Sequence, residues 1–262
     1  MTADQAADQA KHADQAEHIA WVVPCFEEAA RIDGPTFLAF LDEGAPASLI
    51  FVDDGSRDQT LACLRAMAEK RPTQIDVIAL PTNQGKAEAV RLGMLAALSR
   101  GANIVGYSDA DFATPPRELH RLAGLVRAGG YDILMGSRVQ LLGRAIERKH
   151  ARHYLGRVFA TCASLSLGLP VYDTQCGAKL FRHTEALARA LEQPFTSRWV
   201  FDVELLARLV RPGPGIAGIT EERIREEPLL SWTDVPGSKL RPAAALRSGL
   251  DLLRIGVKLR LF

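Results

Sequence analysis

Short apolar segments alternate with longer amphipathic ones over the first half of the chain. Five apolar segments have the length of buried strands, at positions 19–24, 47–54, 74–80, 103–109 and 131–137. Between them, apolar residues recur at helical spacing and predict helices, at 57–70, 85–100 and 116–129. This alternation predicts an α/β fold with a mostly parallel sheet and helices on both faces. Ligands of such sheets bind beyond the carboxyl ends of the strands.

The pattern changes after the fifth apolar segment. Residues 138–157 carry six Arg or Lys and one Glu. Further along, the pattern predicts a strand at 173–182, a loop leading into a helix at 197–210, and an edge strand at 218–228.

The two ends of the chain differ from this middle part. Residues 1–18 are polar and repeat ADQA without a face to bury, which predicts a disordered tail. Residues 242–262 combine a stripe of leucine and valine with several Arg and Lys, which predicts an amphipathic helix. That helix either packs on the domain or lies on a membrane surface. A single domain is therefore expected over residues 19–241.

Composition narrows the classes of function. The 262-residue chain is 47% hydrophobic, enough for one large α/β domain or two small ones. Its net charge of +1 offers no general attraction for nucleic acid. The four cysteines show no zinc spacing and no CxxC pair, which is typical of a reduced, cytoplasmic protein. The longest uncharged run, 158–172, is too short to span a bilayer.

Two carboxylates follow the fourth predicted strand in the segment YSDADFATPP. Asp109 and Asp111 flank one small residue, and a cation would remove the repulsion between them. Oxygen ligands of this kind suit Mg²⁺ or Mn²⁺, which often share such a site with substrate phosphates. The alternative is an ordinary turn in which Asp111 caps the helix that begins near Pro115.

Two further strand ends carry polar residues. Asp53 and Asp54 close the second predicted strand, as ligands of a base or ribose or as part of a turn in which Ser56 caps the next helix. Gly85 and Lys86 open a later helix, either in contact with a nucleotide or as a helix start with a solvated lysine. The chain has no GxxxxGK[ST] and no GxGxxG motif, which disfavours P-loop and dinucleotide-binding folds.

Seven motifs occur in order along the chain: VVPCFEEAARI, FVDDGSRDQT, NQGKAEAVRLGM, YSDADFATPP, GSR, DTQCGAKLFR and RWVFDVELLARL. As an ordered set they resemble glycosyltransferase family 2 and imply its GT-A fold, a Rossmann-like fold of nucleotide-diphospho-sugar transferases. The branch that makes polyprenyl-phosphate sugars is the nearer match. Within it, DADFATPP, RWVFDVELL and PGSKLRP look most similar to dolichyl-phosphate β-glucosyltransferases.

The resemblance implies roles for the donor-binding residues. The nucleotide pocket would be lined by Pro24, Phe26, Glu28, Asp53 and Asp54. Gly85 and Lys86 would lie over the donor. Asp109 and Asp111 would hold Mg²⁺ or Mn²⁺ against the donor diphosphate.

The resemblance also implies an acceptor site and a base. Arg138 and Arg152 match the arginines that bind acceptor phosphate in the mannosyl branch, and Asp202 falls where many family 2 enzymes carry a catalytic base. The basic segment 138–157 would then be the acceptor site, and its alternative is a solvated run of charge.

The chain departs from the family pattern at three positions. Gly156 replaces a phosphate-binding serine of the mannosyl branch, and Glu27 replaces the more usual asparagine of the first motif. Ala113 replaces a metal-binding glutamine, so water is expected to complete the metal's shell.

The predicted activity is inverting transfer of a hexose to a polyprenyl phosphate. UDP-glucose is the favoured donor, and the enzyme would be cytoplasmic, with a peripheral position on the cytoplasmic face of a membrane as a further expectation. Two family alternatives are GDP-mannose-dependent transfer to the same acceptor and transfer to a sugar hydroxyl, for which Asp202 would be an indispensable base. A sugar-phosphate nucleotidyltransferase and an inactive binding module are the rivals from other classes.

Overall fold

The computed structural model describes residues 17–43, 47–147, 150–235, 250–252 and 254–256. Its centre is a seven-stranded sheet in the order β3-β2-β1-β4-β7-β5-β8. The strands are β1 Ile19–Cys25, β2 Ala47–Asp53, β3 Ile75–Ala79, β4 Ile104–Tyr107, β5 Ile133–Ser137, β7 Lys179–Arg182 and β8 Ile224–Pro228. A separate two-stranded parallel sheet pairs β6 (Ala145–Glu147) with β9 (Ser231–Thr233).

The sheet is mostly parallel, as predicted. β1 pairs in parallel with both β2 and β4, and β2 pairs in parallel with β3. β7 runs antiparallel between β4 and β5, and β5 then pairs in parallel with β8 at the edge. The antiparallel strand therefore separates two parallel groups, and it brings a segment from late in the chain into the middle of the sheet.

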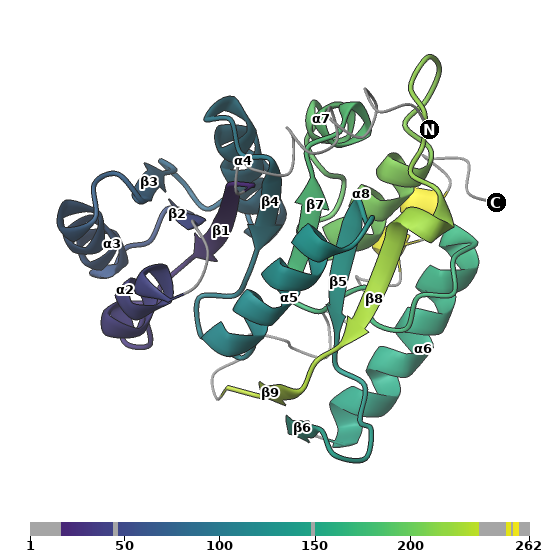
Figure 1. The fold of residues 1–262 in the computed structure, drawn as a ribbon, viewed down its shortest axis with the longest axis horizontal. Helices are drawn as coiled ribbons and strands as arrows, with labels where there is room; N and C mark the ends of the chain where they lie inside the picture. Colours follow the sequence, from purple (N-terminus) through teal and green to yellow (C-terminus); the bar gives the residue numbers. More distant parts are fainter. Residues whose placement is uncertain (1–16, 44–46, 148–149, 236–249, 253, 257–262) are drawn as a thin grey trace, which may run out of the picture.

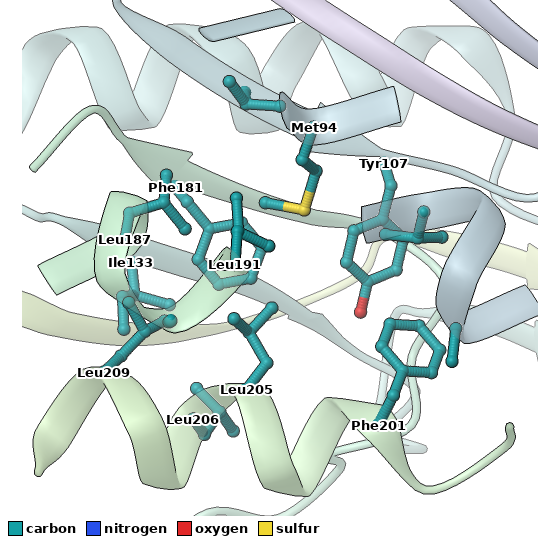
Figure 2. Packing of buried hydrophobic residues seen from close by; sticks show 14 of the residues in the cluster. Met94, Tyr107, Ile133, Phe181, Leu187, Leu191, Phe201, Leu205, Leu206 and Leu209 are labelled. Carbon is teal, nitrogen blue, oxygen red and sulfur yellow. The ribbon is translucent and has the colours of Figure 1, made fainter. Parts of the chain in front are cut away.

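Helices cover both faces of the sheet (Figure 1). One face carries α2 Gly34–Asp42, α3 Thr60–Lys70 and α5 Pro116–Ala128; the other carries α4 Lys86–Ser99, α6 His150–Leu167, α7 Glu185–Leu191 and α8 Phe201–Val210. β1 shows why both are needed, because Ala20 and Val22 point into one core whereas Trp21 and Val23 point into the other. Figure 2 shows part of the core beneath α8, with Leu205 and Leu209 facing the sheet.

Three helices were not predicted: α2, α6 and the short α7. α2 begins where the Asp33 carboxylate accepts a hydrogen bond from the Thr36 N–H, next to a proline in the first turn. It is short, and its apolar residues gave no clear repeat. α6 starts inside the basic segment and ends at Leu167 inside the uncharged run, so parts of two segments of opposite composition form one helix.

Two predicted strands are shorter than expected. Of 173–182 only Lys179–Arg182 is extended, because Asp173 turns back to bond Arg138. Of 218–228 only Ile224–Pro228 is a strand, after the 3₁₀ turn η1 (Glu221–Arg223), and it does lie at the sheet edge as predicted.

The predicted tail and terminal helix lie largely outside the described residues. Of 1–18 only two residues are described, and of 242–262 only 250–252 and 254–256, all six helical. The boundaries 1–18, 19–241 and 242–262 stay a prediction. Among the residues that the structure describes, no helix combines the length and the apolarity needed to cross a membrane.

Candidate active site

The carboxyl ends of β1, β2 and β4 meet at one edge of the sheet. Cys25 at the end of β1 is in register with Asp53 at the end of β2, and the Asp54 N–H donates to the Cys25 carbonyl at 2.8 Å. On the other side of β1, the Ser108 N–H donates to the Val22 carbonyl at 3.0 Å. The motifs that follow the three strands therefore lie side by side, as parallel pairing requires.

Asp54 holds the loop that leads into α4. Its carboxylate oxygens accept from the Gln84 N–H at 2.6 Å and from the Gly85 N–H at 2.8 Å. Burial raises the pKa of Asp54, even though these two bonds and Arg198 act in the opposite direction. Gly85 has φ +98°, and a Cβ there would come within 2.9 Å of Arg198 Nε, so glycine is required for both reasons.

Asp53 is buried beside it. Its side chain is 2% exposed, and Oδ1 has no hydrogen-bond partner among the described residues. A buried carboxylate oxygen in this state is costly unless a ligand completes it. Asp53 therefore fits the predicted role in binding a nucleotide.

The first motif is braced from the loop after β2. The Glu28 N–H donates to Thr60 Oγ1 at 2.8 Å, and the Glu27 N–H donates to Ser56 Oγ at 2.9 Å. Ser56 is thus not the helix cap that the alternative interpretation required, since α3 begins four residues later. The Glu28 carboxylate bonds Arg31, and Pro24 and Phe26 are half-buried on the same strand end.

Lys86 joins the predicted metal pair. Its Nζ lies 2.5 Å from Asp109 Oδ1. Burial by itself lowers the pKa of Lys86, but the charges of Asp109, Asp202 and Asp111 outweigh it and the pKa is raised. Burial and the neighbouring charge of Asp109 raise the pKa of Asp111. The acidic side chains already hold one cation and repel each other.

Asp111 does not cap α5. Its Oδ1 accepts from the Ala113 N–H at 3.1 Å, and the N-cap of α5 is Pro115, without a side-chain bond. Asp111 therefore stabilises a turn in its own loop, and the part of the alternative that made it a helix cap is wrong. Asp109 packs against the backbone of Gly177, where a Cβ would lie 2.1 Å from Asp109 Oδ2.

The residues present fit a divalent cation. Asp109 and Asp111 offer hard oxygen ligands next to each other, and a lysine ammonium already balances Asp109. Within the described ranges no group of three or more His, Cys, Asp or Glu forms a closed metal centre. Two carboxylates with open positions suit a metal that takes its other ligands from phosphate and water.

Asp202 lies near Lys86, but it is buried and bonded to other side chains. It is 6% exposed, and its Oδ1 accepts from Lys179 Nζ at 2.7 Å and from the Tyr107 hydroxyl. Lys179 is 1% exposed, and its Nζ also donates to the Cys176 carbonyl. Figure 2 shows Tyr107 directing its hydroxyl toward the start of α8, where Phe201 precedes Asp202. Asp202 is thus the centre of a buried charged network.

Arg138 also has a carboxylate partner within the protein. Nε and Nη2 bond the two oxygens of Asp173 at 2.7 and 2.8 Å, and the guanidinium lies 5.3 Å from the centre of the Trp232 ring. Burial lowers the pKa of Arg138, but the charge and hydrogen bonds of Asp173 outweigh it and the pKa is raised. Arg152 is in the first turn of α6.

Four residues of the site escaped the sequence analysis. Gly177 and Lys179 were inside the motif DTQCGAKLFR, and Arg198 was inside RWVFDVELLARL, but no role was assigned to them. Arg198 donates to the Asn83 and Gln84 carbonyls and closes the loop before α4. Asp173 was also given no role, because the whole segment 173–182 was predicted to be a strand.

Comparison with known proteins gives the family. The family model of Glycosyl transferase family 2 matches residues 20–187. The chain belongs to this family and is a glycosyltransferase.

The similar proteins point to one branch of the family. The dolichyl-phosphate β-glucosyltransferase of Drosophila melanogaster is 34% identical over 265 residues, covering 90% of this chain and 74% of that protein. The Homo sapiens protein of the same name is 34% identical over 253 residues, with the same two coverages.

A solved structure supports the fold. Glucosyl-3-phosphoglycerate synthase from Mycobacterium tuberculosis, in complex with Mn²⁺ and UDP-glucose, has a TM-score of 0.68 and 20% identity, covering 95% of this chain and 83% of that one. The predicted GT-A fold is confirmed.

Proposed function

We propose that the protein transfers glucose from UDP-glucose to a polyprenyl phosphate, with inversion at the anomeric carbon. The observation that carries the proposal is the gathering of carboxylates at the ends of β2 and β4. Lys86 Nζ lies 2.5 Å from Asp109 Oδ1, Asp111 is close enough to Asp109 for its pKa to be raised, and one oxygen of Asp53 has no hydrogen-bond partner among the described residues. A donor diphosphate with its metal ion would bind at these carboxylates.

On the donor side, the strand ends would bind the nucleotide. Asp53 and Asp54, with Pro24, Phe26 and Glu28, would contact the base and ribose, and Gly85 and Lys86 would lie over the diphosphate. Asp109 and Asp111 would hold Mg²⁺ or Mn²⁺, which neutralises the charge of the leaving diphosphate. The M. tuberculosis structure carries both Mn²⁺ and UDP-glucose, which supports this choice of metal and donor.

On the acceptor side, Arg138 and Arg152 would orient the lipid phosphate. A phosphate monoester has a second pKa of about 6, so its oxygen is a nucleophile at neutral pH without a general base. Asp202 is bound to Lys179 and Tyr107, which suits a positioning role better than proton abstraction. A sugar hydroxyl as acceptor would instead need a free base. We place the reaction on the cytoplasmic face of a membrane.

A donor screen tests the proposal. Purified protein is incubated with Mn²⁺ or Mg²⁺, citronellyl phosphate or a longer polyprenyl phosphate, and UDP-glucose, GDP-mannose or UDP-N-acetylglucosamine. Mass spectrometry should detect glucosyl lipid with UDP-glucose. A product only with GDP-mannose would overturn the donor, and donor hydrolysis without any lipid product would overturn the acceptor.

A further inference from the structure

An exposed turn presents leucine side chains next to the candidate acceptor site. Leu142 is 104% exposed, Leu141 is 49% exposed and Leu230 is 39% exposed. Leu230 belongs to the same patch, because its carbonyl accepts from the Ala145 N–H at the start of β6. We call these three residues the leucine patch. A group of exposed apolar side chains marks a binding surface, whereas single ones are ordinary.

The turn is built so that Leu142 projects outward. The Arg144 N–H donates to the Leu141 carbonyl at 3.1 Å, which closes a four-residue turn with Leu142 at its corner. Gly143 has φ +80°, the conformation that such a turn assigns to glycine. Gln140 also donates from its side chain to the Ile146 carbonyl and ties the loop to β6. The exposure of Leu142 is therefore set by backbone geometry.

The patch is directly connected to the site. Figure 1 shows β6 and β9 together at one end of the molecule, beside the start of α6. In β9, Trp232 packs under the guanidinium of Arg138, and the Thr233 N–H donates to the carbonyl of Ala113 in the loop of the metal pair. A molecule bound by its phosphate at Arg138 would have its apolar part leave near the leucine patch.

Positive charge next to the leucine patch favours contact with the anionic surface of a lipid bilayer. Arg117 is exposed and donates to Ser231 Oγ in β9 at 3.0 Å, and Arg144 is the last residue of the turn. The Leu230 N–H donates to Glu118 Oε2 at 2.9 Å, but this carboxylate is buried, at 1% exposure, and is bound by Arg121. Apolar side chains with flanking arginines are the composition of segments that insert into the headgroup region of a bilayer.

We infer that the leucine patch docks the protein on the bilayer that holds the acceptor, with Leu142 inserted below the headgroups. The inference rests on the proposed lipid acceptor. It places the membrane contact at the turn 141–144, beside Arg138, so that a lipid phosphate reaches the site without leaving the bilayer surface.

The test uses the full chain and vesicles of phosphatidylcholine and phosphatidylglycerol. Leu142→Ser should lower the vesicle-bound fraction, and the double change Leu141→Ser with Leu142→Ser should weaken partitioning at least about tenfold. Leu142→Trp should retain or strengthen it, because tryptophan favours the membrane interface. Leu165→Ser, which changes a leucine that is 78% exposed on α6, is the matched control and should bind as the unchanged protein does.

Transfer to polyprenyl phosphate in vesicles is measured beside hydrolysis of UDP-glucose without lipid. The KM for polyprenyl phosphate in vesicles should rise in the double variant, while donor hydrolysis should stay the same. Vesicle binding that is unchanged in the double variant, or equally reduced in Leu165→Ser, overturns the inference. So does loss of a dimer in the double variant, because the patch would then bind a second copy. Loss of vesicle binding without any transfer in the unchanged protein supports the surface and overturns the proposed function instead.

Discussion

The two halves of the site hold their charges in different ways. The donor half, at the ends of β1, β2 and β4, sets Lys86 against Asp109 and Asp111, and Asp53 at the end of β2 keeps an oxygen without a partner among the described residues. The acceptor half, at β5 and β7, pairs its charges internally, Arg138 with Asp173 and Lys179 with Asp202. The donor half has an excess of negative charge that a cation would relieve, whereas Arg138 and Lys179 in the acceptor half already have carboxylate partners.

This difference assigns different tasks to the two halves. An acidic cluster in which the pKa values of Asp54 and Asp111 are raised is suited to binding a metal and a diphosphate. A set of closed ion pairs is suited to keeping side chains in fixed positions, since a buried pair contributes little net stability but is costly to break. Substitutions in the donor half should therefore change mainly the rate of transfer. Substitutions in the acceptor half should change both the placement of side chains and the stability of the fold.

The largest effect is expected in the donor half. Asp111→Ala should lower turnover about a thousandfold or more, because the metal would lose one of its two carboxylates. The fold should survive, since the described bond of Asp111 is to Ala113 in its own loop. Transfer is measured at saturating Mn²⁺, with thermal unfolding as the check on stability. Asp76→Ala, which removes an exposed ion pair with Arg100, is the control and should be near normal. Near-normal turnover of Asp111→Ala would remove the metal assignment.

The buried pair should give the largest change in stability. Lys179→Met or Asp202→Asn alone should lower the free energy of unfolding by about 3–5 kcal/mol, because each leaves a buried polar group without its partner. The double variant should recover most of this loss, as measured by urea unfolding.

The same double variant distinguishes positioning from base catalysis. If Asp202 only holds its neighbours in place, the refolded double variant should transfer glucose with unchanged pH dependence near neutrality. A variant that is stably folded yet inactive would instead make Asp202 a base and favour a hydroxyl acceptor.

A smaller effect is expected at the arginines. Arg138→Ala and Arg152→Ala should each raise the KM for the acceptor by roughly 10–100-fold and leave donor hydrolysis nearly unchanged. Arg138→Lys should restore little, because lysine cannot make the two parallel bonds to Asp173. Arg189→Ala, at an exposed pair, serves as the control. Equal loss of transfer and hydrolysis would show that these arginines do not belong to the acceptor half.

The smallest effect lies at the opposite end of the strands. His120 lines a cavity of about 170 Å³ near the start of β1, and burial lowers its pKa. A histidine whose pKa is lower in the folded state stabilises the fold fully above its unfolded pKa of about 6.5. This stabilisation is lost as the pH falls through that value toward the lower pKa of the folded state. His120→Asn should flatten the decline of unfolding free energy between neutral and mildly acidic pH, without changing turnover per folded molecule. Some decline should remain, because burial also lowers the pKa of His18. If the unfolding free energy of His120→Asn depended on pH as that of the unchanged protein does, His120 would not be the titrating group.

Much of the donor half could be predicted from the sequence. The strands that end at Cys25, Asp53 and Tyr107 are apolar segments of the right length, and parallel pairing brings their ends to one edge. The motifs after them therefore had to be neighbours, whatever the details of the helices.

The contacts of the acceptor half could not be predicted in this way. Arg138 and Asp173 are 35 positions apart, and Lys179 and Asp202 are 23 apart, with no local pattern to join them. The strand prediction for 173–182 also hid the turn that brings Asp173 to Arg138.

The sequence by itself determined the α/β class, the positions of the first five strands along the chain and the acidic edge of the sheet, because hydrophobic periodicity and strand-end motifs are local signals. Only the tertiary structure decided that β7 enters the sheet antiparallel between β4 and β5. That insertion places Gly177 against Asp109 and Lys179 against Asp202. The reason is physical: strand order and ion pairing depend on which distant surfaces can be buried together, and no single segment of the chain carries that information.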